Sequence, residues 1–311
     1  MALDAAPLRG VIPPVCTPLT PERAFDPDSF RRLLNHQIDA GIHGAFILGS
    51  TSEAPLLTND VQDEVIATAV EHIDGRVPVI AGCIDFTTNR VIERAQHARE
   101  LGADAVVVCP PFYVTPSVGE MIRHFDAVRS AVDLPILAYD VPAATHVKLP
   151  RPVIHELASS GAIVGIKDSS GQDANFRGVI LDNQDNQDFR IFTGSELVSD
   201  TSIFMGAHGI VPGLANVDPA GYVRLFDAAS AGEWAVARKE QDRLYRLFDI
   251  IYVPEPDAYG FSAAAHGAFK VALYELGLIA HPHTAMPHTL LTDDHHQEIR
   301  RLLQRAGLVP Q

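Results

Sequence analysis

The feature that most constrains the fold is an alternation of two kinds of segment along the chain. Short apolar runs, rich in β-branched residues, alternate with segments whose apolar residues have helical spacing. The apolar runs are VIPPVCTPL, GAFILGS, VPVIAGC, AVVVCPPFY, PILAYDVP, AIVGIKDSS, FRIFTGS and AHGIVPGLAN. They are apolar almost throughout, which is typical of strands in a parallel sheet covered by helices. The sequence therefore predicts a parallel α/β fold.

Start and stop signals support the helices between these runs. Asp26 and Asp218 each place a capping carboxylate before a proline, and Ser117 has a glutamate three residues later, as in a capping box. Glycines at positions 41, 75, 102 and 161 fall where helices should end. Eight strand–helix pairs predict a (β/α)8 TIM barrel over residues 1–232. Residues 233–311 then form a C-terminal helical extension packed on the barrel.

A doubly wound sheet is the alternative architecture. The chain contains neither GxGxxG nor GxxxxGK[ST], the phosphate-binding signatures that often accompany such sheets. The barrel is therefore the favoured prediction.

Composition excludes several classes of partner and location. The chain of 311 residues has a formal net charge of −15, which argues against a nucleic-acid or anionic-membrane partner. No apolar stretch reaches the roughly 18 residues of a membrane span, and no signal-peptide pattern opens the chain. Cys16, Cys83 and Cys109 lie in apolar runs without a CxxC pair, which predicts buried, reduced thiols in a cytoplasmic protein.

Lys167 is the most informative of the four lysines because it ends an apolar strand, in AIVGIKDSS. A buried ammonium is costly unless it is paired or gives up its proton. A neutral amine can attack a carbonyl carbon and form a Schiff base. Residue type alone leaves two interpretations open: a catalytic amine, or a structural ion pair inside the barrel.

Tyr139 favours the catalytic interpretation. It ends the preceding strand, so its phenol and Lys167 are predicted to face the same space, where the phenol can relay protons. Asp140 and Asp168 directly follow these residues, and strand alternation should turn them to the opposite face as structural partners. Of the other lysines, Lys239 is predicted at the surface and Lys270 at a helix edge reaching toward water. Lys148 is predicted either at the surface or facing substrate.

The segment GSTSE, residues 49–53, offers hydroxyl and backbone N–H groups after the second strand. Such a turn can hold a carboxylate. The alternative is an ordinary loop leading to a helix that Thr58 caps.

As a set, these segments resemble the family of dihydrodipicolinate synthases and N-acetylneuraminate lyases, which are pyruvate-dependent class I aldolases. The resemblance covers nearly the whole chain. It rests on GSTSE, YDVP, GIKDSSG, PPFYVTPSVGEMIRHF and GAHGIVPGLANVDP. It implies a barrel, usually a homotetramer built as a dimer of dimers, and no metal or organic cofactor.

The resemblance also implies roles for individual residues. Lys167 is the Schiff-base lysine for a 2-oxo acid such as pyruvate, and Tyr139 relays protons. Tyr113 matches a tyrosine that family members contribute to a neighbouring subunit's proton relay. The pyruvate carboxylate is expected at Ser50 and Thr51, with help from the main chain near Val211.

Departures from the family pattern concern the second half of the substrate. Ala144 stands where dihydrodipicolinate synthases have an arginine that binds the second substrate, which argues against aspartate semialdehyde. The run Pro212, Gly213 and Leu214 is less polar than the sugar-binding lining of sialic-acid lyases. His146 and Glu196 are candidate contacts to this half, with surface or structural roles as the alternative for each.

Three functions are compared. The first is a Schiff-base lyase that performs aldol cleavage or condensation with pyruvate, or dehydration of a 2-keto-3-deoxy sugar acid. Within this family 4-hydroxy-tetrahydrodipicolinate synthase is disfavoured by Ala144. The second is a metal-dependent lyase or hydrolase, suggested by HPHTAMPH (281–288) and DDHHQEI (293–299), whose histidines we expect to be solvated. The third is a non-catalytic barrel that binds a 2-oxo acid.

Overall fold

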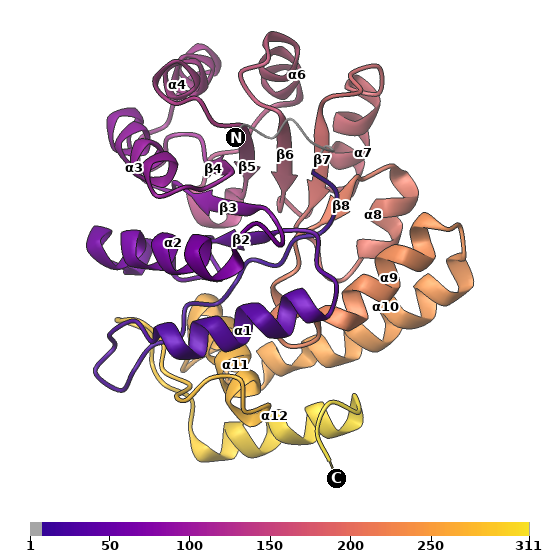
Figure 1. Ribbon diagram of the computed structural model, residues 1–311. Coiled ribbons are helices and arrows are strands. Elements are labelled where there is room, and N and C mark those ends of the chain that lie inside the picture. Colours follow the sequence, from indigo (N-terminus) through magenta and orange to yellow (C-terminus); the bar gives the residue numbers. More distant parts are fainter. Residues whose placement is uncertain (1–7, 311) are drawn as a thin grey trace.

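The computed structural model describes residues 8–310 and contains a sheet of eight parallel strands in the order β1-β8-β7-β6-β5-β4-β3-β2. The strands are β1 (Gly10–Val11), β2 (Ala45–Ile47), β3 (Val79–Gly82), β4 (Ala105–Val108), β5 (Ile136–Asp140), β6 (Gly165–Asp168), β7 (Arg190–Thr193) and β8 (Gly209–Ile210). Parallel backbone pairing of Pro14 with Phe46 joins the β1 segment to β2 and closes the sheet. The predicted (β/α)8 barrel is confirmed, and Figure 1 shows the strands at the centre of a ring of helices.

Helices follow the strands and then continue beyond the barrel. They are α1 (Pro27–Asp39), α2 (Asn59–Ile73), α3 (Thr88–Glu100), α4 (Val118–Ala131), α5 (Pro142–Thr145), α6 (Arg151–Ser160), α7 (Asp173–Asp182), α8 (Ser199–Met205), α9 (Pro219–Ser230), α10 (Trp234–Phe248), α11 (Phe261–Glu275) and α12 (Asp293–Arg305), with 3-10 turns η1 (Ala54–Leu56), η2 (Gly213–Asn216) and η3 (Asp249–Tyr252). None of the helices within residues 8–310 is long and apolar enough to cross a membrane.

Local sequence signals account for the helix ends. Asp26 accepts a hydrogen bond from the Ser29 N–H at the start of α1, and Asp218 accepts one from the Gly221 N–H at the start of α9. Thr58 caps α2, and the capping box of Ser117 and Glu120 begins α4. The predicted glycine stops all have positive φ.

Strands β1 and β8 are much shorter than the apolar runs that predicted them. Proline has no N–H to donate to a ladder. Pro13 and Pro14 follow β1, and Pro212 follows β8, so regular pairing ends there while the chain stays buried.

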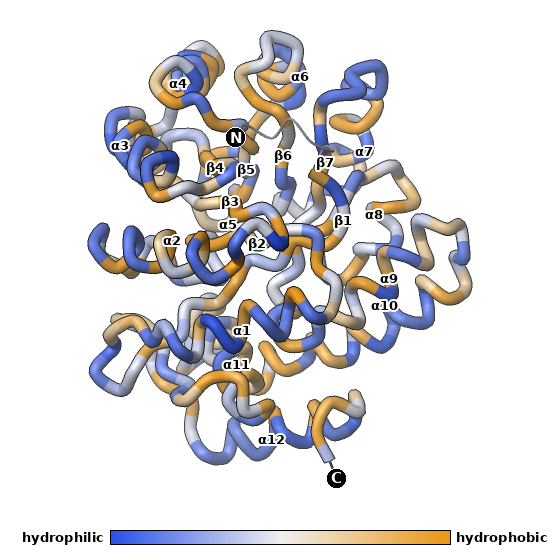
Figure 2. The backbone as a smooth tube through the Cα atoms, in the orientation of Figure 1, coloured by the Kyte–Doolittle hydropathy of each residue, from blue (hydrophilic) through white to orange (hydrophobic). Residues whose placement is uncertain are grey.

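Two buried layers hold the barrel together. One lies inside the strands and includes Ile12, Phe46, Tyr139, Phe192 and Val211. The larger layer lies between strands and helices. Most helices in Figure 2 carry both hydrophobic and hydrophilic residues, as expected for elements with one face on a core.

The elements after α9 contact the barrel at α1 and at the turn after β2. The Ala280 N–H donates to Ser29 Oγ at 2.9 Å, and the Ala285 N–H donates to a Glu53 carboxylate oxygen at 2.7 Å. In Figure 1, α11 and α12 lie on the same side of the barrel as α1. The C-terminal segment therefore reaches a loop at the carboxyl end of a barrel strand, which is where active sites of such barrels are built.

Candidate active site

Lys167 and Tyr139 lie side by side at the carboxyl ends of neighbouring strands. They are register partners in the β5–β6 pairing, and both are buried. The Lys167 Nζ lies 4.4 Å from the centroid of the Tyr139 ring and 5.0 Å from that of Phe46. Their side chains share the interior of the barrel, as the strand pattern predicts.

No ion pair neutralises Lys167 within residues 8–310. Two other lysines each have a carboxylate partner: the half-buried Lys148 pairs with Asp140, and the buried Lys270 pairs with Glu53. Around Lys167 the contacts are instead aromatic faces, which attract a cation weakly. The geometry therefore favours the catalytic interpretation of this lysine over a structural ion pair.

The neighbouring aspartates point elsewhere. Asp140 accepts hydrogen bonds from Lys148 and from the Leu149 N–H, and burial raises the pKa of its carboxyl above the usual value despite these donors. Asp168 accepts a hydrogen bond from the Ser170 N–H at 2.7 Å. Both make structural contacts, and the partner of Lys148 is Asp140.

Gly194, directly after β7, makes room for the lysine. A Cβ atom at this position would overlap Ser169 Oγ and come within 3.0 Å of Lys167 Cε. Glycine is therefore needed there for the lysine side chain to take its observed course.

The turn at residues 49–53 is tied firmly to the barrel. Ser52 donates its hydroxyl hydrogen to the Val15 carbonyl and accepts a hydrogen bond from the Gly49 N–H. The family that the sequence resembles usually has glycine at this position. Ser50 and Thr51 are half-buried at the tip of this turn. Their position after β2 places them at the same end of the barrel as Lys167.

Glu53 is the member of this turn whose importance was not predicted. Its carboxylate is 1% exposed and forms an ion pair with the fully buried Lys270 of α11. The prediction that Lys270 reaches toward water is therefore wrong. Residues on nearly every side of α11 are buried, so Lys270 has no route to solvent and needs the partner that Glu53 supplies.

Glu196 lies over the start of η2, where its carboxylate accepts a hydrogen bond from the Leu214 N–H at 2.7 Å. Burial raises the pKa of this carboxyl to about 7, although the backbone donors and the Lys167 charge act in the opposite direction. A carboxyl with this pKa can both give and take a proton near neutral pH.

The main chain of Val211 can offer a ligand only its carbonyl. The Val211 N–H already donates to the Thr193 carbonyl.

Two predicted site residues lie on the surface. Tyr113 is 93% exposed with a positive φ, and its ring centroid lies 6.3 Å from that of Phe86. His146 caps α5 in the left-handed region and is exposed, close in sequence to the exposed Ala144. Within this single chain, neither Tyr113 nor His146 is buried in the barrel interior with Lys167.

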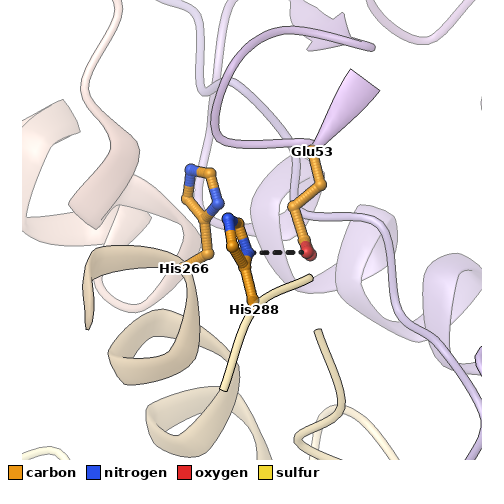
Figure 3. Close-up of side chains that lie close together, drawn as sticks. All are labelled: Glu53, His266 and His288. Atoms are coloured by element: carbon orange, nitrogen blue, oxygen red, sulfur yellow. Dashed lines mark ion pairs between the residues drawn. The ribbon is translucent and has the colours of Figure 1, made fainter. Parts of the chain in front are cut away.

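The histidine-rich segments are less solvated than predicted. Thr284 is fully buried, the His288 side chain is 12% exposed beside Glu53, and His295 is buried in the capping box that begins α12. His266 joins Glu53 and His288 in a cluster drawn in Figure 3. Glu53 lies more than two hundred residues before His266 and His288 in the sequence, so no local pattern reveals this cluster.

Comparison with known proteins decides the family. A family model described as the dihydrodipicolinate synthetase family matches residues 7–306. The chain belongs to this family. The predicted resemblance is thus confirmed, and the chain is a lyase, as predicted.

Relatives and solved structures agree over almost the full length. A 4-hydroxy-tetrahydrodipicolinate synthase of Nitrosomonas eutropha is 33% identical over 303 residues, 96% of this chain and 99% of the relative. An uncharacterized DapA-like lyase of Halobacterium salinarum is 34% identical over 78% of this chain and 79% of its own. The crystal structure of YagE, a prophage protein of the same family from E. coli K12 in complex with pyruvate, has a TM-score of 0.91 at 29% identity, covering 98% and 100% of the two chains.

Proposed function

We propose that this family member is a Schiff-base-forming lyase that acts on a 2-oxo acid, with Lys167 as nucleophile and Tyr139 as proton relay. The observation that carries the proposal is a buried Lys167 amine, 4.4 Å from the Tyr139 ring centroid, without a carboxylate partner in the described chain. The pyruvate bound in the structure of YagE supports the choice of a 2-oxo acid.

The chemistry follows from an amine beside a phenol. The Lys167 amine attacks the C2 carbonyl, and Tyr139 then donates its proton to the departing hydroxyl, so that water leaves, a protonated imine forms and Tyr139 becomes a phenolate. In aldol cleavage the C3–C4 bond breaks, its electrons pass into the protonated imine, and Tyr139 takes up the proton of the C4 hydroxyl as the aldehyde leaves. The resulting enamine is protonated at C3, and water then hydrolyses the imine to release pyruvate and the free amine. No cofactor is needed for these steps.

The 2-oxo-acid half of the substrate is assigned to the turn after β2 and to β8. Ser50 and Thr51 supply hydroxyl and N–H groups for the carboxylate, in a turn that Ser52 and Glu53 anchor. The Val211 carbonyl completes this side. Three free, buried cysteines fit the reducing, cytoplasmic setting that the sequence predicts.

The other half of the substrate is assigned to a sugar-acid or aldehyde moiety that Glu196 and His146 contact. Ala144 offers no charge, and the next arginine, Arg151, is held by two hydrogen bonds to Asp182, at 2.6 and 2.7 Å. A second carboxylate, as in aspartate semialdehyde, therefore lacks a guanidinium partner here. Glu196 is suited to hold hydroxyl groups or to assist loss of one, as in a dehydration.

4-Hydroxy-tetrahydrodipicolinate synthase is the second candidate because relatives that are 33% identical to this chain bear that name. A non-catalytic barrel that binds a 2-oxo acid is the third. The three differ in what they turn over, which gives a direct experimental separation.

The experiment is a substrate screen that follows pyruvate formation from 2-keto-3-deoxy sugar acids, pyruvate condensation with assorted aldehydes, and condensation of pyruvate with aspartate semialdehyde. We expect turnover of a sugar acid or a neutral aldehyde. Lys167→Arg should abolish that turnover, and Lys239→Arg, on the exposed face of α10, should leave it unchanged. Efficient condensation with aspartate semialdehyde would favour the second candidate, and pyruvate binding without any turnover would favour the third.

We also infer a homo-oligomer, a tetramer built from dimers, because an exposed Tyr113 fits the tyrosine that family members contribute to a neighbouring subunit. Phe86, Tyr113 and Val114 are exposed together at the loops after β3 and β4. A second copy covering them removes apolar surface from water.

A further inference from the structure

A cluster of three potential metal ligands joins the turn after β2 to the C-terminal segment. Glu53 ends that turn, His266 lies on α11, and His288 lies between α11 and α12. One ligand atom from each residue lies within 4.8 Å of the other two. Figure 3 shows the three side chains converging from separate parts of the chain.

Two ring nitrogens in this cluster lack a partner. The Nδ1 atoms of His266 and His288 are shielded from solvent, and neither makes a hydrogen bond within the described chain. The His288 Nδ1 lies 3.5 Å from a Glu53 carboxylate oxygen, outside good hydrogen-bond geometry. Buried polar atoms are normally satisfied, and an ion or a water is the usual explanation when they are not.

The donor set matches a known preference. Two imidazole nitrogens and one carboxylate oxygen, with a fourth position left for water, form a frequent tetrahedral zinc sphere.

We propose that Glu53, His266 and His288 bind one divalent transition-metal ion, with Zn²⁺ as the favoured ion. The site holds no reacting atom of the lyase chemistry. A bound ion would instead tie the turn that carries Ser50 and Thr51 to α11 and to the segment before α12. It departs from the sequence-based expectation of solvated histidines and no metal.

Lys270 sets the strength of this site. It pairs with one oxygen of Glu53, and the other oxygen accepts the Ala285 N–H at 2.7 Å. A metal ion on the second oxygen shares the carboxylate with the ammonium of Lys270, which repels it. The site should therefore bind Zn²⁺ more weakly than a comparable site without a neighbouring lysine, while keeping its preference for ions that take nitrogen ligands.

The test uses the full-length protein, stripped of metal and titrated with ZnCl₂ in a calorimeter. A parallel titration with CoCl₂ follows the visible absorption of tetrahedral Co²⁺. We expect about one ion per chain, a rise in melting temperature on adding Zn²⁺, and at least tenfold weaker binding in His266→Gln and in His288→Gln. His155→Gln, on the exposed surface of α6, is the matched control and should bind as the unaltered protein does.

Melting curves of the metal-free variants separate folding from binding. A variant that melts near the unaltered protein without metal, but gains no stability from Zn²⁺, supports the site. The proposal is overturned if the unaltered protein binds no ion, or if both cluster variants bind as tightly as the His155→Gln control does, because the ion is then held elsewhere.

Discussion

At the scale of single residues, the site depends on a contrast between lysines. The half-buried Lys148 and the buried Lys270 each pair with a carboxylate, while Lys167 lies beside the rings of Phe46 and Tyr139. Paired lysines are held as charged, structural groups, and a lysine without such a partner is available for chemistry. The proposed nucleophile is thus distinguished by its neighbours.

Tyr139→Phe tests the proton relay. The ring remains to pack beside Lys167, but the hydroxyl is lost, so we expect turnover to fall by about 10²- to 10⁴-fold with little change in stability. Steady-state rates with the substrate found by the screen measure this, alongside urea unfolding. A variant with undiminished turnover would remove Tyr139 from the mechanism.

Glu196→Gln tests whether burial raises the pKa of the Glu196 carboxyl. Because the folded-state pKa of Glu196, about 7, lies above the ordinary value of 4.5, the folded protein binds more protons than the unfolded chain between these pH values. Its contribution to stability therefore falls as pH rises through this window. The variant should lose that dependence. The unfolding free energy at pH 4.5 minus that at pH 8 should therefore be lower in the variant than in the unaltered protein, by about 1 to 3 kcal/mol. Parallel pH dependence in both proteins would contradict the assignment.

At the scale of elements, the C-terminal helices support the site. Helix α11 contributes Lys270 to Glu53, and the following segment contributes the Ala285 N–H to the same carboxylate. Glu53 itself has a positive φ of 61°, an unfavourable conformation for a residue other than glycine. These contacts hold the turn of Ser50 and Thr51 in one conformation.

Lys270→Met tests this support. Removing one partner leaves a buried charge unpaired, so we expect a loss of about 3 to 5 kcal/mol in unfolding free energy. The Glu53 pKa, about 2, lies below its ordinary 4.5, so this stabilisation is complete above pH 4.5 and is lost as pH falls toward 2. The variant should show a weaker acid dependence over that range in urea titrations.

Two further variants serve as controls for Lys270→Met. Lys239→Met, at an exposed position of α10, should change stability little. Adding Glu53→Gln to Lys270→Met should recover part of the loss, since the unpaired charge is removed. A Lys270→Met protein as stable as the Lys239→Met control would show that the pair contributes nothing.

The sequence predicted elements better than their long-range contacts. Capping residues such as Asp26 and Asp218 act on neighbouring backbone, so the helix starts were found. Lys270 was misplaced, although α11 is apolar on nearly all sides, which is itself a signal of a buried helix. Glu53, His266 and His288 meet only because the barrel and the extension fold together, and no spacing rule encodes that.

At the scale of the whole molecule, the proposed assembly depends on one exposed surface. Tyr113 and the neighbouring Phe86 and Val114 are exposed, while the proposed relay of Lys167 and Tyr139 lies inside the barrel. The net charge of −15 makes chains repel one another, so the proposed assembly requires specific contacts such as these.

Tyr113→Ala combined with Phe86→Ala tests the predicted assembly. Loss of aromatic area should lower the oligomeric mass measured by light scattering and reduce turnover. Phe204→Ala, which removes an exposed ring from α8, should leave both unchanged. A monomeric unaltered protein that is fully active would contradict the predicted tetramer.

The most direct measurement of the central claim is trapping of the imine with borohydride. The protein is incubated with pyruvate and sodium borohydride, digested, and examined by mass spectrometry, with Lys167→Arg and Lys239→Arg treated in parallel. We predict a reduced pyruvyl adduct on Lys167 in the unaltered protein and in Lys239→Arg, and no adduct in Lys167→Arg. An adduct on another lysine, or none under conditions in which pyruvate binds, would contradict the assignment of Lys167 as the Schiff-base residue.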